Sequence, residues 1–202
     1  ELPSHPELLD WLANRFVKSG WDTNSLIYDI VTSATYRQQS RFHKDSVQVD
    51  PRNRLLSRAP RFRLTAEEIR DMALASSGQL NPVIGGPSVR PFQPLNYFSA
   101  NSGQRWQADT GETARRRAIY TYLQRTAPFP AHLIFDAPSR QICTATRPRT
   151  NTPLQALVMM NDPLFVGAAG ALAQKTLQCG AASESDKARF LFRSVLSRSP
   201  AA

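Results

Sequence analysis

The stretch TRPRTNTPLQAL at residues 146–157 contains the clearest helix start in the chain. Thr152 is a favourable N-cap residue, and Pro153 suits the first helical position, where an N–H would have no intrahelical partner. Gln155 follows Thr152 by three residues, which completes the pattern of a capping box. These features predict a helix that begins at Pro153.

This helix is expected to be short, because the sequence NDP at residues 161–163 combines a stop with a second start. Asp162 is a suitable N-cap and Pro163 a suitable first residue for the next helix, which we expect to end at Gly180. A last helix is expected between the polar residues at 183–185 and the Ser-Pro pair at 199–200.

The N-terminal third also has helical patterns. The sequence SHPE at residues 4–7 resembles a capping box, and the helix it begins is expected to end at Gly20. A second helix follows Asp22. Its apolar residues recur at helical spacing and are expected to be buried. These residues are Leu26, Ile27, Ile30, Val31 and Ala34.

Residues 42–53 have few large apolar side chains and are expected to form a loop. The sequence TAEE at residues 65–68 is a second strong capping box, and its helix is expected to end near Gly78. Proline and glycine are then frequent, and aromatic residues alternate with them, which indicates an ordered but irregular segment. Within it, β-branched and aromatic residues favour a short extended stretch at 115–123.

The fold class expected from these patterns is mainly α, with about six helices around one core and at most a small sheet. We divide the single expected domain into N-terminal helices at 1–78, an irregular insertion at 79–138 and C-terminal helices at 139–202. The first residue is Glu1 and not methionine. The chain is therefore expected to be a piece of a longer polypeptide.

Composition narrows the classes of function. The 202 residues are 41% hydrophobic, and no apolar run approaches the roughly 18 residues of a membrane-spanning helix. The formal charge of +9 is typical of a protein that meets a polyanion. The arginines are scattered, however, and no nucleic-acid-binding motif accompanies them, so nucleic acid is the weaker alternative.

The two cysteines, Cys143 and Cys179, do not form a CxxC or CxxCH motif. We therefore expect no haem, zinc or other cofactor in this chain. A disulfide between the two cysteines and two free buried thiols both remain open.

Arg147 and Arg149 lie immediately before the predicted helix start, where arginines and a helix N-terminus together favour an anion. With Asp136, Arg140 and Asn151 they form the candidate site for an anion or another ligand. The alternative is that these arginines pair with nearby carboxylates and hold an irregular connection in place.

An enzymatic alternative adds Asp162 to this group. Asp136 and Asp162 would then act as paired acids on a polyanionic or carbohydrate substrate, provided that they lie close together. Aromatic residues of the insertion would stack on sugar rings in that case, although packing in the core is their commoner use. These residues are Tyr97, Phe98 and Trp106.

Several long motifs resemble one family. They are ELPSHPELLDWL at 1–12, IVTSATYR at 30–37, RFRLTAEEIRD at 61–71, GGPSV at 85–89, FDAP at 135–138 and RTNTPLQAL at 149–157. Together they resemble the C-terminal PSD-type domain of planctomycete and verrucomicrobial proteins, domain of unknown function 1553, over nearly the whole chain.

The resemblance implies a setting and no chemistry. Members are exported proteins, periplasmic or otherwise outside the cytoplasm, and a separate cytochrome domain often carries a c-type haem. The resemblance makes a Cys143–Cys179 disulfide more plausible, because such compartments are oxidising. It implies that the partners are other domains of the parent protein, with the cytochrome domain as a candidate. We therefore expect a binding or scaffold module, with a hydrolase or redox enzyme as the alternative.

Overall fold

The computed structural model describes residues 2–41, 44–94, 96–103, 105–180 and 183–200. Over these residues the chain is mainly helical, as the sequence predicts, with nine α-helices, two short 3-10 helices and two isolated bridges instead of a sheet. Its contacts divide it into two compact units, residues 1–62 and 63–202. The expectation of one domain stays a prediction, and each unit is described by itself.

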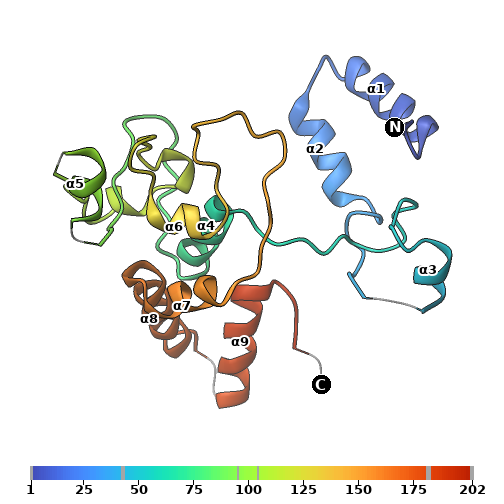
Figure 1. Ribbon diagram of the computed structural model, residues 1–202. Helices are drawn as coiled ribbons and strands as arrows, with labels where there is room; N and C mark the ends of the chain where they lie inside the picture. Colours follow the sequence, from blue (N-terminus) through green and yellow to red (C-terminus); the bar gives the residue numbers. More distant parts are fainter. Residues whose placement is uncertain (1, 42–43, 95, 104, 181–182, 201–202) are drawn as a thin grey trace. The chain divides into compact units, whose positions relative to one another are not determined.

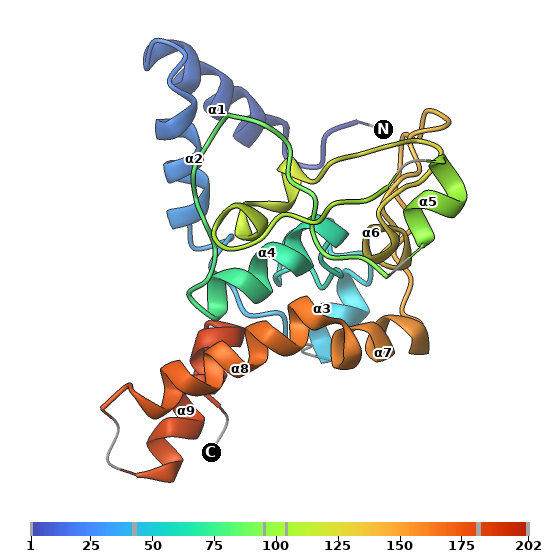
Figure 2. The same ribbon diagram turned by 90° about the vertical axis from the view of Figure 1, so that its left-hand side faces the viewer.

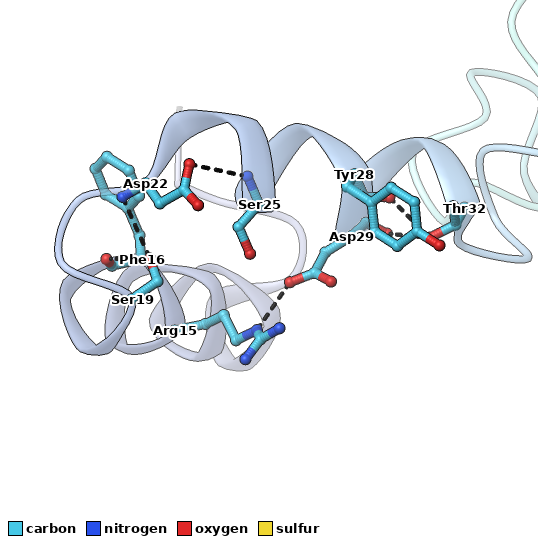
Figure 3. A network of polar contacts seen from close by, with 8 residues as sticks. All are labelled: Arg15, Phe16, Ser19, Asp22, Ser25, Tyr28, Asp29 and Thr32. Atoms are coloured by element: carbon cyan, nitrogen blue, oxygen red, sulfur yellow. Dashed lines mark hydrogen bonds and ion pairs between the residues drawn. The ribbon is translucent and has the colours of Figure 1, made fainter.

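The first unit contains α1 (Pro6–Lys18), α2 (Thr23–Thr32) and α3 (Lys44–Val49). Helices α1 and α2 form a hairpin (Figure 1). Asp22 caps α2 by accepting hydrogen bonds from the backbone N–H groups of Asn24 and Ser25. An ion pair of 2.8 Å between Arg15 and Asp29 joins the two helices (Figure 3). Local capping and one cross-helix pair thus define this hairpin.

Three expectations for the first unit are wrong. The N-cap of α1 is His5, whose side chain makes no capping hydrogen bond, so the expected box at residues 4–7 does not form. The expected loop at 42–53 contains α3. None of the residues of α2 is buried, because two packed helices without a third layer leave much of each apolar face open.

The second unit is organised around α4 (Ala66–Ser76), which contacts α6 (Pro130–Ile134), α8 (Pro163–Leu177) and α9 (Glu184–Leu196) (Figure 2). Helix α7 (Pro153–Asn161) contacts α6 and α8. The remaining elements are α5 (Tyr97–Ser102), η1 (Thr113–Arg115) and η2 (Ala118–Tyr120). Ala66, Ile69 and Phe135 form a buried cluster, and Leu64, Ala137, Val158 and Phe165 pack around it.

The four helix starts expected in this unit are confirmed, the last of them being that of α9, whose N-cap is Ser183. Thr65 and Thr152 each form a complete capping box, and Asp162 caps α8 through the Leu164 N–H. Among the described residues no single helix is long and apolar enough to cross a membrane. Helices α7 and α8 pass that test only as a pair, with a 60° bend between them.

Buried arginines hold the insertion. Arg70, 3% exposed, donates to the carbonyl oxygens of Arg116 and Ala114 at 2.6 and 2.7 Å. Arg116 is also buried, donates to the Gly85 and Pro87 carbonyls and stacks over the Tyr120 ring at 4.0 Å. The expectation of an extended stretch at 115–123 is correct only in part, because Arg116 and Thr121 form isolated bridges with Asn81 and Val89, but the 3-10 helix η2 lies between them. Part of the positive charge is therefore structural.

Candidate functional site

The loop after α6 and the segment before α7 contain all five residues of the predicted site. Asp136 and Arg140 both have φ of 63°, in the left-handed region that non-glycine residues rarely adopt. Arg147, Arg149 and Asn151 precede Thr152, the N-cap of α7. The sequence therefore identifies a continuous region of the second unit, although its residues have different partners.

The Asp136 carboxylate binds Thr150. It accepts a hydrogen bond of 2.7 Å from the Thr150 backbone N–H and further bonds of 2.8 and 3.0 Å from the Thr150 hydroxyl. The backbone hydrogen bond is the largest cause that lowers the pKa of Asp136, and the Arg63 charge adds to it. Asp136 is therefore ionised at neutral pH and is a poor general acid.

Gln155 lies at the centre of this network and is 0% exposed. Its Nε2 donates to the Ile134 carbonyl at 2.8 Å, to the Thr150 hydroxyl at 3.1 Å and to Asp136 at 3.4 Å. Its Oε1 accepts the Thr152 N–H at 3.4 Å, as the capping box requires. One buried amide thus joins the end of α6, the loop at Asp136 and the start of α7.

Two contacts join the same region to the start of α4. Arg147 forms a 2.8 Å ion pair with Glu67, and the Arg63 guanidinium donates to the Asn151 side-chain oxygen at 2.9 Å. Burial acts to raise the pKa of Glu67, but the hydrogen bond and charge of Arg147 outweigh it and the pKa is lowered. The pairing of Arg147 with a carboxylate is the structural alternative that the sequence left open.

These contacts surround a cavity of about 510 Å³, which we call the arginine cavity. Arg63, Arg147 and Arg149 contribute cationic groups to its lining, and Asp136 contributes a carboxylate. The rest of the lining is Leu64, Thr65, Ala66, Phe135, Ala145, Thr146 and Pro148. Arg140 is exposed and does not line this cavity, and neither does Asn151. The structure thus brings together three of the five predicted residues.

Four residues of this region were absent from the predicted site. Arg63 and Glu67 come from the start of α4, more than 60 residues earlier in the sequence than their partners Asn151 and Arg147. Thr150 lies between two residues of the predicted site, Arg149 and Asn151. For Gln155 the sequence predicts only a capping role. The available signal is the capping box at residues 65–68, whose third residue, Glu67, has no part in the cap and can pair with an arginine.

The paired-acid arrangement has no support in the geometry. Asp136 lines the arginine cavity, whereas Asp162 lines two others and accepts the Leu164 N–H at 2.9 Å. The aromatic residues pack on one another and on the backbone. The ring centroids of Trp106 and the buried Phe98 are 4.9 Å apart. Trp106 donates a hydrogen bond to the Pro91 carbonyl, and Tyr97 donates one to the Pro128 carbonyl.

The described residues contain neither a disulfide nor a metal-binding cluster. Cys143 and Cys179 are both free, so the structure contains no disulfide between them, and because Cys143 is exposed and Cys179 is half-buried, the alternative of two buried thiols is also wrong. No group of three or more His, Cys, Asp or Glu side chains in the described part of the chain is arranged to hold a metal ion.

Comparison with known proteins identifies a family without a known activity. Neither a search of curated proteins nor a search of solved structures gives a match. A family model described as PSD1, protein of unknown function (DUF1553), matches residues 1–202, which include the helix starts and the whole arginine cavity. The chain therefore belongs to the PSD1 (DUF1553) family.

Proposed function

We propose that this chain is a binding module and that the arginine cavity takes an anionic ligand, such as the carboxylate or sulfate of a glycan. The observation that carries the proposal is the lining of the cavity, with three arginines and one carboxylate. Asp136 already accepts hydrogen bonds from Thr150 and Gln155, so its charge is partly offset. Guanidinium groups bind such anions through paired N–H donors.

The cavity is preorganised for this role. The ion pair with Glu67 holds Arg147, and the hydrogen bond to Asn151 holds Arg63, so neither side chain needs to be ordered when a ligand arrives. Preorganisation lowers the entropic cost of binding. A buried amide, Gln155, fixes the loop that carries Asp136.

Replacement of Arg149 by glutamine should weaken binding of sulfate and of a galacturonic acid oligomer by about tenfold to a hundredfold. A hydrogen bond to a charged group contributes about 1.5–3 kcal/mol, which corresponds to that range. Isothermal titration calorimetry at 150 mM salt measures the dissociation constants. Arg140→Gln is the matched control, because it removes the same charge from an exposed position outside the cavity lining. Equal losses in the two variants, or no binding to the wild type, would contradict the proposal.

In the exported setting that the family resemblance suggests, we also propose that the module docks onto another domain of its parent protein, for which a cytochrome domain is the first candidate. Helix α1 and the turn between α1 and α2 leave large apolar side chains exposed, including Trp11 and Trp21. A tagged form of this chain should co-purify with that domain and gain thermal stability in its presence. Replacement of Trp11 and Trp21 by serine should remove the association, while sulfate binding stays unchanged. If the two proteins neither associate nor change stability, the docking proposal is wrong.

A further inference from the structure

A second cavity in the same unit lies between the loop at residues 92–94, α6, the end of α7 and the start of α8. Its volume is about 310 Å³, within the range of small-molecule sites. Its walls are largely apolar, and the side chains that form them include Phe92, Phe129, Ile134 and Val158. We call it the Asp162 cavity, after the one charged residue in the described part of its lining.

The Asp162 carboxylate is half-buried at this cavity. It caps α8 by accepting hydrogen bonds from the backbone N–H groups of Leu164 and Phe165. The two oxygens of an ionised carboxylate offer about four acceptor positions, so a cap of two donors leaves positions open to a ligand.

The charge of this carboxylate is not well compensated within the fold. Burial is the largest influence on the pKa of Asp162 and raises it, although both N–H groups and the charge of Arg70 lower it. Arg70 does not come to the carboxylate as a partner, because its guanidinium donates to the Arg116 and Ala114 carbonyls. A cation that reached Asp162 from the cavity would offset its partial removal from water.

The other polar groups of the cavity also favour a cation. Its described lining contains no arginine, lysine or histidine. The Asn161 amide nitrogen donates to the Leu157 carbonyl at 2.8 Å, which leaves the amide oxygen of this exposed side chain as an acceptor. Both polar atoms of the Gln93 side chain are enclosed by protein and take no part. The end of α7 and the start of α8 meet here with opposite dipole charges, so the carboxylate sets the sign of the site.

We propose that the Asp162 cavity binds an organic ammonium ion with an apolar substituent, whose N–H groups donate to the Asp162 carboxylate and to the Asn161 oxygen. Aromatic rings attract such cations, and Phe92 and Phe129 both line the cavity. The apolar substituent removes the remaining walls from water. The site goes beyond the anion proposal, because it has the opposite charge preference and no lining residue in common with the arginine cavity.

The first test is titration of the ¹⁵N-labelled chain with benzylamine at pH 7, followed by NMR. Backbone amide shifts should change at residues 92–94, 129–134 and 157–163. Benzyl alcohol, a neutral probe of nearly the same shape, should bind about tenfold more weakly or worse, since it cannot form a charge-assisted hydrogen bond. Sulfate should not compete with benzylamine, so this result is independent of the anion proposal.

A blocked lysine, N-acetyl-lysine methylamide, distinguishes two sources of the same ammonium chemistry. Tighter binding of this probe than of benzylamine would identify a lysine side chain of a peptide as the ligand. Weaker binding would identify a free amine. In both cases the shifts should map to the same residues of the cavity.

Asp162→Asn provides the second test. Asparagine is as good an N-cap as aspartate, so the variant should fold as the wild type does. It removes the charge, so benzylamine should bind about tenfold more weakly or worse, while benzyl alcohol should bind as before. Asp22→Asn is the matched control, because it makes the same change at the N-cap of α2, outside the lining of this cavity, and should leave benzylamine binding unchanged.

Three results would overturn the proposal. The wild type would bind neither ammonium probe at about 10 mM, it would bind benzyl alcohol as tightly as benzylamine, or Asp162→Asn would bind benzylamine as well as the wild type does.

Discussion

Replacement of Gln155 by glutamate should destabilise the second unit by about 3–5 kcal/mol at pH 8, the magnitude typical of an uncompensated buried charge. The side chain is 0% exposed, and its Nε2 faces two oxygen acceptors, the Ile134 carbonyl and the Asp136 carboxylate. A glutamate would place a negatively charged oxygen against both. The substitution changes almost no volume, so the loss reports the hydrogen-bond polarity of the network and not a packing defect.

The loss in free energy of unfolding of Gln155→Glu, relative to the wild type, should become smaller as the pH falls. Burial and the neighbouring carboxylate raise the pKa of the new acid above its unfolded value, so the folded state binds a proton more tightly than the unfolded state. The destabilisation is therefore fully present above the folded pKa and is relieved as the pH approaches the unfolded value of about 4.3. Urea denaturation at pH 8 and pH 5 measures both free energies of unfolding.

Gln174→Glu is the matched control, because it makes the same chemical change at an exposed position of α8 and should alter stability by less than about 0.5 kcal/mol. If the two variants were equally stable, the assigned role of Gln155 in joining α6 to α7 would be wrong. A third variant, Gln155→Met, separates charge from hydrogen bonding. It should cost about 1–3 kcal/mol at both pH values, because it leaves the Ile134 carbonyl unpaired without adding a titrating group.

The sequence predicts the starts of α4, α7 and α8 because a cap is a local device. Thr152 and Gln155 complete their capping box within four residues, so no distant contact is needed to anticipate it. The second role of Gln155, at the Ile134 carbonyl and Asp136, depends on a loop that begins about 20 residues earlier. No local pattern indicates that contact, because the capping box by itself explains why a glutamine occurs at position 155.

The same distinction explains the candidate site. The sequence indicates Arg147 and Arg149 as candidates because they are charges beside a helix start. Whether they pair with a carboxylate or bind a ligand depends on the groups that lie opposite them. Glu67 and Arg63 come from α4 and its approach, so the sequence separates them from the rest of the region. The partial error at residues 115–123 has the same origin. β-branched and aromatic residues favour an extended chain there, and Arg116 and Thr121 do form bridges, but the 3-10 helix η2 interrupts the stretch, which no local pattern indicates.

Stability should fall by up to about 3 kcal/mol as the pH is lowered from 7 to 4, because of His132. Its side chain is buried, with 9% exposure, and its ring lies edge-on to Phe129 with 5.1 Å between the ring centroids. Its Nε2 has no hydrogen-bond partner in the described part of the chain. Burial lowers the pKa of His132 from 6.5 to about 4. Around it, the Glu67 and Asp71 carboxylates favour the charged ring, and the Arg70 and Arg147 guanidinium groups oppose it.

The sign follows from proton binding. Between pH 6.5 and 4 the unfolded state holds a proton on His132 that the folded state lacks, so stability rises with pH across that window and is lost as the pH falls. One pKa unit corresponds to about 1.4 kcal/mol, which sets the size of the loss. Native carboxylates with lowered pKa values, such as Asp50 and Asp136, lose their contribution only as the pH falls below about 4, so they do not share this window.

His132→Phe isolates the effect, because phenylalanine keeps the edge contact with Phe129 and cannot titrate. The variant should be at least as stable as the wild type at pH 7, since it removes an unpaired buried nitrogen, and its free energy of unfolding should stay nearly constant down to pH 4.5. His5→Phe, which changes a histidine at the start of α1, should keep the wild-type slope. Denaturant titrations at half-unit pH steps measure all three proteins. A wild type without a slope between pH 6.5 and 4.5, or a slope that survives in His132→Phe, would show that this buried histidine does not carry the pH dependence.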